Sequence, residues 1–479
     1  MIRGVEVSKS YTKDIVLDKV SFVLNDGIKV GLVGKNGCGK TTLLRLIIGE
    51  EFIDSGLIEV NKNEIGYIPQ ELKFKNEKIM IGEHLHQFLE NPYEEYKFDI
   101  LKNELDFQNF DIYQTIDTLS EGQKMKIKFM ELLLQDKTTI LIDEPTNHLD
   151  IVGIMWFENF LKYSKYTVLM ISHDRQFLNE TVDEIWEIDN KKLTVYRGNY
   201  DYYRGQKDYL IDKQNKEYKD FLRRKDYLEK FLERARHEGN RSNIRFAKRR
   251  IQDEIVDGEK TKYDDRKVET VTFQTDIRKS KLIVGIDDVT KNFGENTLYE
   301  NLNLEIRGQE KIWLYGPNGT GKTTLVKMIM GLEEPTTGNI RLGVNLKTGY
   351  FAQVHEELKQ NETLHEEFLK QTGCEYFKSF GYLNNFLFDK SDLDMKMFQL
   401  SPGQRARFAL SIFSYNDYDF LILDEPTNHL DIPTKEVIEK SLREFKGTLL
   451  LISHDRYFVE SCNCTRMFNL ATFQDIGLV

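Results

Sequence analysis

Cysteine is scarce in this chain of 479 residues, which contains only Cys38, Cys374, Cys462 and Cys464 and no CxxC pair. This spacing argues against a zinc site and a disulfide-stapled scaffold, and favours a reduced cytosolic protein. Long apolar runs are also missing, because no stretch approaches the roughly 18 residues of a membrane span. The first residues enter a strand-like pattern instead of a charged and then apolar leader, and the alternation from Val5 to Leu24 predicts an antiparallel strand pair. We therefore expect a cytoplasmic protein with no membrane span and no targeting segment.

The composition is that of an ordinary globular protein. Hydrophobic residues make up 40% and aromatic residues 12% of the chain, which is enough for substantial cores in roughly two to four domains. The formal net charge of -11 disfavours nonspecific binding of nucleic acid by the whole surface. A net charge summed over a long chain can conceal a local basic patch, and one such patch occurs near the middle of this sequence.

A glycine-rich segment, GKNGCGKT, runs from Gly34 to Thr41 between a strand-like and a helix-like run, and a second copy, GPNGTGKT, runs from Gly316 to Thr323. The backbone N–H groups of such a loop can surround a phosphate, and its lysine can pair with the β- and γ-phosphates at a helix N-terminus. The helix start also favours a thiolate at Cys38, but we expect this residue to be a tolerated small side chain of the loop. The predicted nucleotide-binding residues are Gly34, Lys35, Asn36, Gly37, Cys38, Gly39, Lys40, Thr41, Thr42, Gly316, Pro317, Asn318, Gly319, Thr320, Gly321, Lys322, Thr323 and Thr324.

A second repeated phrase reads ILIDEPTNHLD in the first half and LILDEPTNHLD in the second. Counted from the lysine of each phosphate loop, Gln70 lies 30 residues further on and Gln353 lies 31 residues further on. The later landmarks keep this register within one residue. A repeat of this length predicts two α/β nucleotide-binding domains, at residues 1–200 and 281–479.

Each copy of this phrase places two acidic residues at the carboxyl end of a buried parallel strand, where ligands bind in such folds. Asp143 and Asp424 can reach the coordination shell of Mg²⁺, as can the hydroxyl groups of Thr41 and Thr323. The glutamates that follow the aspartates can orient or deprotonate a water that attacks a γ-phosphate. The predicted catalytic residues therefore include Glu144 and Glu425, and both sites are expected to hydrolyse ATP.

The order of motifs resembles the ATP-binding cassette. The first half reads phosphate loop, YIPQ, LSEGQ, ILIDEP, HLD and ISHD, and the second reads phosphate loop, YFAQ, LSPGQ, LILDEP, HLD and ISHD. EPTNHLD in both halves of one chain resembles the ABC-F subfamily of tandem ATPases that act on the ribosome. The resemblance covers nearly the whole sequence and implies an ATP hydrolase that uses ATP and Mg²⁺.

The resemblance also assigns roles to residues outside the loops. It implies a γ-phosphate contact for the histidines, sensing of the metal and water for the glutamines, and stacking on adenine for the aromatic residues. A structural hydrogen bond, a polar loop position and a core aromatic are the respective alternatives. These residues are His173 and His454, Gln70 and Gln353, and Tyr11 and Phe293.

The signature segments LSEGQ and LSPGQ are expected to open helices whose N-termini donate to a phosphate. In the family this segment faces the phosphate loop of the other half, which implies that Lys40 pairs with Ser401 and Lys322 with Ser120. Gly122 and Gly403 belong to the same segments. Both copies depart from LSGGQ at the third position of the motif, where Glu121 and Pro402 stand in place of a glycine, which puts the turnover rate in doubt more than ATP binding.

Between the two halves, residues 201–280 predict an antiparallel helical hairpin. Mostly apolar positions recur in steps of four and three along a helix from Tyr203 to Arg236, and Gly239 and Asn240 break it. A return helix is predicted from the spacing of Ile244, Ala247, Ile251 and Ile255. Between Phe221 and Arg250, eleven basic residues stand against four acidic ones, a net charge of +7. A solvated charged helix is the common explanation, but such a helix mixes the signs more evenly.

A basic hairpin tip suits the phosphate backbone of RNA. The resemblance implies binding to the ribosome with contacts to rRNA and P-site tRNA. The predicted RNA-binding residues are Arg234, Arg236, Arg241, Arg245, Lys248, Arg249 and Arg250. Only 50 residues separate Gln70 from Ser120, which leaves no room for the helical arm of housekeeping members. Members without the arm include many antibiotic-resistance proteins that protect the ribosome.

Two other functions compete with this interpretation. The energy subunit of an ABC transporter would need a separate membrane partner, and the basic hairpin would have no function in such a subunit. A DNA-maintenance ATPase would need longer coiled coils or zinc modules. We favour a tandem ATPase that binds two MgATP between its halves and acts on translation. A monomer is expected, because both composite sites would close within one chain.

Overall fold

The computed structural model describes residues 1–11, 14–89, 91–107, 110–147, 149–256, 277–294, 296–351, 361–428 and 430–478. The chain forms two compact units. One comprises Met1–Asn199 together with Val268–Val479, and the other is Tyr200–Lys267.

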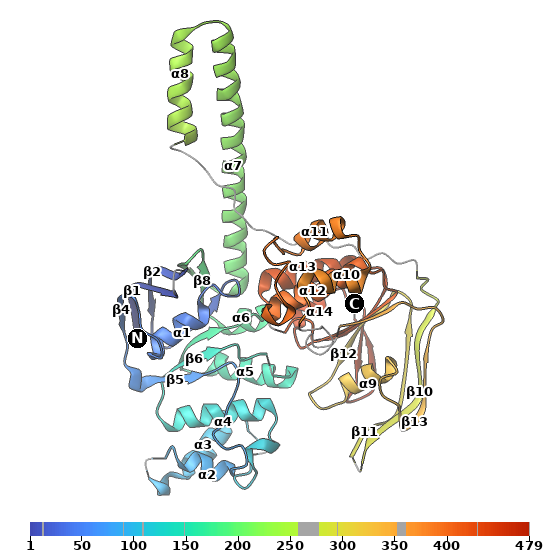
Figure 1. The fold of residues 1–479 in the computed structure, drawn as a ribbon. Coiled ribbons are helices and arrows are strands. Elements are labelled where there is room, and N and C mark those ends of the chain that lie inside the picture. Colours follow the sequence, from blue (N-terminus) through green and yellow to red (C-terminus); the bar gives the residue numbers. More distant parts are fainter. Residues whose placement is uncertain are drawn as a thin grey trace. The chain divides into compact units, whose positions relative to one another are not determined.

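A six-stranded sheet with the order β5-β6-β7-β3-β8-β9 forms the centre of the first half (Figure 1). Neighbouring strands are parallel except for β8 and β9. The strands are β3 (Lys29–Val33), β5 (Ile65–Ile68), β6 (Thr139–Asp143), β7 (Thr167–Ile171), β8 (Glu184–Asp189) and β9 (Lys192–Arg197). Every residue of β6 and β7 is buried, as expected for the apolar strands of a parallel sheet.

A smaller antiparallel sheet precedes and flanks this core. The strand pair predicted near the N-terminus is confirmed, because β1 (Ile2–Tyr11) pairs with β2 (Asp14–Leu24), and β4 (Ser55–Glu59) pairs with the other edge of β1. The helices of this half are α1 (Lys40–Ile48), α2 (Ile81–His86), α3 (Tyr96–Glu104), α4 (Glu121–Leu134), α5 (Ile151–Tyr163) and α6 (Arg175–Thr181).

The second half repeats this topology strand for strand. Its six-stranded sheet has the order β14-β15-β16-β12-β17-β18, and its three-stranded sheet has the order β11-β10-β13. The strands are β10 (Leu282–Phe293), β11 (Asn296–Arg307), β12 (Lys311–Tyr315), β13 (Thr337–Leu342), β14 (Thr348–Phe351), β15 (Phe420–Asp424), β16 (Thr448–Ile452), β17 (Arg466–Asn469) and β18 (Gln474–Gly477). The helices are α9 (Lys322–Ile329), α10 (Leu364–Thr372), α11 (Tyr376–Asn385), α12 (Pro402–Tyr415), α13 (Ile432–Glu444) and α14 (Arg456–Ser461).

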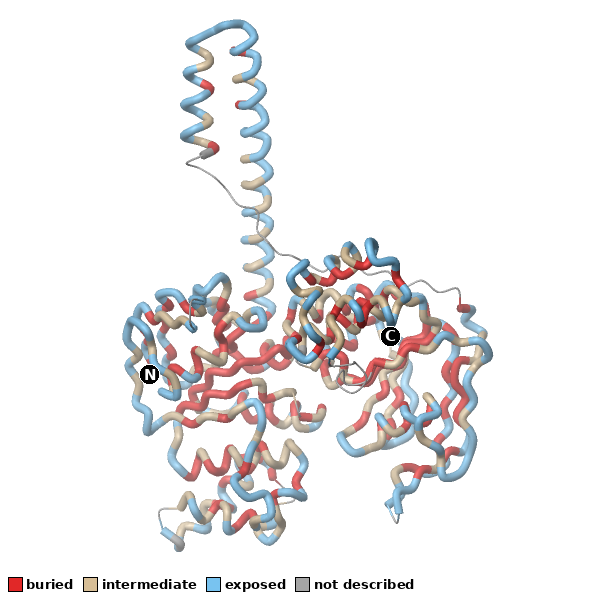
Figure 2. The backbone as a smooth tube through the Cα atoms, viewed as in Figure 1, coloured by how far each residue is buried: buried red, intermediate tan, exposed pale blue. Residues whose placement is uncertain are grey.

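Burial is concentrated in the parallel sheets and the helix faces against them (Figure 2). Because parallel strands end at one edge of a sheet, the segments that follow β3, β6 and β7 lie close together. The same holds for β12, β15 and β16. This edge of each sheet therefore collects the phosphate loop, the acidic pair and the histidine of each half.

The second unit is a helical hairpin. Helix α7 (Tyr200–His237) and helix α8 (Arg241–Ile251) run side by side, and Asn240 caps α8 by accepting a hydrogen bond from the Asn243 amide (Figure 1). The predicted seam is partly buried, with Leu228, Ala235 and Ala247 at no more than 2% exposure. The return helix was predicted to continue to Ile255, but α8 gives way to a π-helical turn over Gln252–Val256. The predicted α/β class with a hairpin between the two halves is confirmed.

Candidate functional site

The two phosphate loops fold alike, and their glycines explain why. Gly39 and Gly321 precede α1 and α9 at φ 104° and 89°, a left-handed conformation that favours glycine. A Cβ atom at Gly321 would lie 2.3 Å from Leu298 Cδ2. The lysine of each loop is held by its own backbone, since Lys40 Nζ donates to two carbonyls at 2.9 and 3.1 Å and Lys322 Nζ donates to two at 2.7 and 2.9 Å. Each ammonium group therefore lies inside the loop.

The structure favours a small loop residue over a thiolate at Cys38. Burial raises the pKa of this thiol above its usual value, against an opposing effect of the Lys40 charge. The thiol therefore stays protonated near neutral pH, and Cys38 is a small residue packed within the loop.

The aspartate and the loop threonine predicted to hold the metal lie next to each other. Thr323 Oγ1 donates to Asp424 Oδ2 at 2.9 Å. Burial raises the pKa of both Asp143 and Asp424, and in each case a hydrogen bond from the loop threonine opposes this effect. Each half thus presents a hydroxyl and a buried carboxylate side by side, which are oxygen donors of the kind that Mg²⁺ prefers.

The predicted catalytic pairs are also brought together. His173 Nε2 lies 3.2 Å from Glu144 Oε1, and His454 Nε2 lies 3.4 Å from Glu425 Oε1. Both glutamates adopt positive φ, 52° and 47°, a costly conformation for a residue with a side chain and one that is concentrated at functional sites. Among the described residues, Glu425 Oε1 and His173 Nδ1 are buried without a hydrogen-bond partner. These polar atoms are arranged to meet a ligand.

The two pairs differ in electrostatics. Burial would raise the pKa of Glu144, but the neighbouring His173, Lys40 and a hydrogen bond from Asn147 lower it to about 2. Burial and the neighbouring Asp424 raise the pKa of Glu425 to about 7. Burial and the Lys322 charge lower the pKa of His454 to about 4. At neutral pH the Glu144 carboxyl group is therefore ionised, whereas the Glu425 carboxyl group is partly protonated.

The signature segments open helices as predicted. Ser120 caps α4 and Ser401 caps α12, in each case by a reciprocal capping box with the glutamine three residues later. Gly122 and Gly403 lie in the first turns of these helices. Both serines are exposed. The pairing of these serines with the lysines of the opposite half stays a prediction.

Two aspartates connect the halves at the phosphate loops. Asp150 Oδ2 accepts from the Asn318 amide at 3.1 Å, and Asp431 Oδ2 accepts from the Asn36 amide at 3.3 Å. Each phosphate loop is therefore contacted by the last residue of HLD from the other half. These aspartates were not among the predicted site residues, although the repetition of HLD at equal spacing was a usable signal.

Two ion pairs between the halves were also missed. Arg175 bonds both carboxylate oxygens of Glu439, and Arg456 pairs with Glu158. The first pair is nearly inaccessible, at 2% and 6% side-chain exposure, whereas the second is at 21% and 12%. The Arg175 guanidinium also lies 3.8 Å from the centre of the Tyr457 ring. Each arginine directly follows SHD, so its repetition could have indicated a shared role.

The predicted aromatic residues are surface residues. Tyr11 is 43% exposed and Phe293 is 52% exposed, so the alternative of a core aromatic is wrong. Gln70 is exposed and follows β5, at the same sheet edge as Asp143. The other predicted glutamine, Gln353, lies outside the described residues.

The predicted RNA-binding residues are all exposed on the hairpin. Arg234 and Arg236 occupy the last turn of α7, and the other five lie on α8. Arg250 is engaged with Glu254, which also pairs with Arg224 at 2.7 Å. The positive surface of the hairpin is therefore reduced near Glu254 and remains strongest toward the turn.

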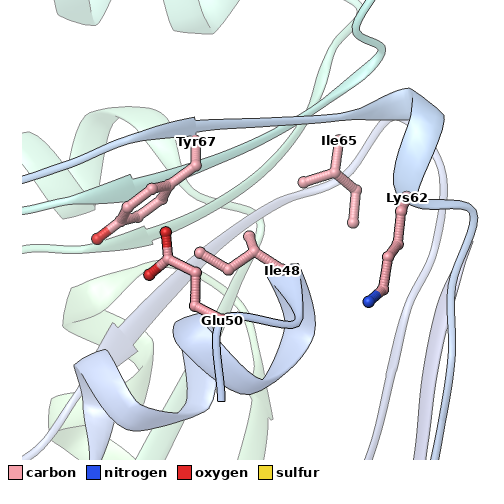
Figure 3. A pocket seen from close by; sticks show the side chains of 5 residues that line it. All are labelled: Ile48, Glu50, Lys62, Ile65 and Tyr67. Carbon is pink, nitrogen blue, oxygen red and sulfur yellow. The ribbon is translucent and has the colours of Figure 1, made fainter.

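A small pocket of about 200 Å³ lies away from these groups (Figure 3). It is bounded by the end of α1 and the start of β5, and Tyr67 and Glu50 extend their polar ends toward each other on one side. Its lining residues are Ile48, Glu50, Lys62, Ile65 and Tyr67. None of them is a predicted site residue, so the candidate site is defined by its loops and charges and not by this hollow.

Comparisons with known proteins agree with the site geometry. A family model described as ABC transporter matches residues 17–147 and 299–428, and a second model with that description matches residues 186–270. ABC transporter F family member 5 of Arabidopsis thaliana is 33% identical over 95% of this chain and 72% of its own length. Ribosome protection protein VmlR of Bacillus subtilis is 31% identical over 96% of this chain and 85% of its own length.

Among solved structures, an archaeal ribosome recycling factor, aABCE1, in complex with the stalk protein aP1 shares the fold at a TM-score of 0.64. Its sequence is 20% identical, and the match covers 97% of this chain and 87% of that one. Among the described helices, none combines the length and the apolar character of a bilayer span. The repeated nucleotide-binding motifs, the matched family models and the full-length relatives together make this chain a member of the ABC-F family of ATP-binding cassette ATPases.

Proposed function

We propose that this ATPase binds two MgATP between its halves, binds the ribosome through the helical hairpin, and leaves the ribosome after hydrolysis. The contacts of Asp150 and Asp431 with the opposite phosphate loops carry this proposal, because they show that residues of both halves form each candidate site. Binding energy from ATP can then favour one arrangement of the two halves over another. We divide the chain into cassettes at residues 1–200 and 281–479 and a linker at 201–280.

Within each site, the residues suit a magnesium ion and an attacking water. The residues that would hold Mg²⁺, which would offset the charge of the phosphates, are Thr41, Gln70 and Asp143 in the first half and Thr323, Gln353 and Asp424 in the second. The catalytic glutamate would orient or deprotonate the water, and the histidine would contact the γ-phosphate. Ser120, Gly122, Ser401 and Gly403 would complete the sites from the opposite halves. The exposed rings of Tyr11 and Phe293 would stack on adenine.

Action on translation is supported by the basic hairpin and by the relatives. The exposed arginine and lysine side chains of α8 suit rRNA and P-site tRNA, whose backbones attract such groups. One relative is named as a ribosome protection protein, which supports protection against an antibiotic as a more specific function. We propose a cytoplasmic monomer with no membrane partner.

Neutralising the hairpin turn tests this function. A variant with Arg241→Gln, Arg245→Gln and Arg249→Gln should bind ribosomes at least about tenfold more weakly, because each lost phosphate contact removes favourable counterion release. The salt dependence of binding should also become shallower, by about one unit of logarithmic slope per lost contact. Ribosome pelleting at several salt concentrations measures both quantities.

The matched control neutralises three exposed lysines in the first half of α7, Lys213→Gln, Lys216→Gln and Lys219→Gln. It removes the same charge from the same helical unit and should change ribosome affinity less than threefold. Equal losses in the two variants would mean that net charge alone governs binding. Unchanged binding in the first variant would refute a role for the hairpin turn.

A further inference from the structure

The two exposed aromatic residues share a neighbour with the same geometry. Lys9 lies two residues before Tyr11 on β1, and Lys291 lies two residues before Phe293 on β10. The ammonium group of Lys9 lies 5.2 Å from the ring centre of Tyr11, and that of Lys291 lies 4.8 Å from the ring centre of Phe293.

Both lysines are also held in place by carboxylate and carbonyl oxygens. Lys291 Nζ donates to Glu333 Oε1 and to the Glu334 carbonyl, both at 2.7 Å. Its side chain is only 8% exposed although the ring beside it is half exposed. Glu333 follows α9, the helix that begins at the phosphate loop. The lysine therefore connects the strand that carries the aromatic ring to the helix that carries the phosphate site.

The first half contains the same connection at equivalent positions. Lys9 Nζ donates to the Phe52 carbonyl at 2.8 Å and lies 3.9 Å from Glu51 and 3.8 Å from Asp54. The Tyr11 hydroxyl also donates to Glu51. These partners follow α1, which begins at the first phosphate loop. In the register of the two phosphate loops, Glu51 corresponds to Glu333 and the carbonyl of Phe52 to that of Glu334, so both lysines are held from equivalent positions.

A cation over one ring face has two consequences. It is attracted by the negative face of the ring, so it holds the ring plane in a fixed orientation. A base that stacks on the ring must then approach the face opposite the cation, from which the cation draws electron density. A purine that stacks there meets a ring that is already oriented, which lowers the conformational cost of binding.

We propose that Lys9 and Lys291 are positioning residues for the adenine base of ATP, acting through Tyr11 and Phe293. The inference rests on the proposed role of these rings in binding adenine. It distinguishes the base from the phosphates, because a lysine that acts through the ring affects a ligand only if that ligand contains a base. A lysine that merely stabilises the fold affects every ligand of the site.

The test is equilibrium binding of two ligands, MgATP and magnesium tripolyphosphate, to the full chain carrying Glu144→Gln and Glu425→Gln to prevent turnover. Lys291→Met keeps the aliphatic stem and removes the charge. It should weaken MgATP binding at the second site by about two- to fivefold, the strength expected of an exposed cation–π contact. Binding of tripolyphosphate should change less than 1.5-fold. Lys291→Arg keeps a cation over the ring and should restore most of the MgATP affinity.

A double-mutant cycle with Phe293→Ala provides the second readout. Once the ring is removed, Lys291→Met should cause no further loss of MgATP affinity. Equal losses for MgATP and tripolyphosphate, or losses that add in the cycle, would overturn the inference and leave the lysine a structural role. If Phe293→Ala itself leaves MgATP binding unchanged, the proposed adenine contact fails, which is a separate outcome. Lys9→Met with Tyr11→Ala repeats the test in the first half.

Discussion

Replacing Glu144 and Glu425 together by glutamine should lower ATP turnover by about a hundred- to ten-thousandfold and leave ATP binding intact. Each carboxylate is on a side chain with only 12% or 13% exposure, lies within 3.4 Å of a histidine nitrogen and follows the aspartate at the end of its strand. Removing a general base from such a position costs catalysis by a factor of this size. Glutamine keeps the shape of the side chain, so the phosphate loops and their lysines stay in place. Phosphate release and equilibrium binding of ATP measure the two effects.

The single variants are informative because the two carboxyl groups differ. The pKa of Glu144 is lowered to about 2, and that of Glu425 is raised to about 7. Glu425→Gln therefore mimics a protonated form that the site already populates at neutral pH, whereas Glu144→Gln removes a charge that is always present. Glu83→Gln, on the exposed face of α2, is the control for loss of one carboxylate and should turn over ATP normally. Full turnover by the double variant would contradict the assignment of both residues.

Replacing Arg175 by methionine should be among the most destabilising single changes at the boundary between the halves. The variant leaves Glu439 buried at 6% exposure without its partner. Breaking a buried ion pair in this way costs roughly 3–5 kcal/mol, because the remaining charge has no compensation. The equivalent change Arg456→Met breaks a more accessible pair and should cost clearly less. Thermal unfolding of the two variants side by side provides the comparison.

The pH dependence gives this prediction a definite sign. Burial already raises the pKa of Glu439, and loss of the guanidinium would raise it further. A folded-state pKa above the unfolded value means that the variant is least affected at low pH, where the carboxyl is protonated in both states. Its deficit should then grow as the pH rises through the folded-state pKa. Adding Glu439→Gln should recover part of the stability. A deficit that is independent of pH and unrelieved by the second change would contradict the account.

The sequence predicted those parts of the site that depend on local backbone. The phosphate loops, the buried strands ending in Asp143 and Asp424, and the capping serines of α4 and α12 follow from residue order and hydrogen bonding within a few positions. In the structure, the histidine and the glutamate of each half lie together because their strands are neighbours in a parallel sheet.

Features that depend on three-dimensional neighbours were missed or wrong. The pair of Arg175 with Glu439 joins residues whose proximity is set by the packing of elements that lie far apart in the sequence. A helix start favours a thiolate at Cys38, but the thiol is buried, and burial raises its pKa. The sequence alone does not show this burial. The last turns of the hairpin were predicted as a regular helix, although Ile255 belongs to a π-helical turn.

Ribosome pelleting of the Glu144→Gln, Glu425→Gln variant, with and without ATP, tests the central claim most directly. The claim requires that ATP bound between the halves favours the form that binds the ribosome and that hydrolysis ends it. The variant should therefore pellet with ribosomes only when ATP is present, whereas the wild-type chain should pellet weakly under the same conditions. A variant that binds ATP yet never pellets with ribosomes at low salt would contradict action on translation and direct the search to a membrane partner.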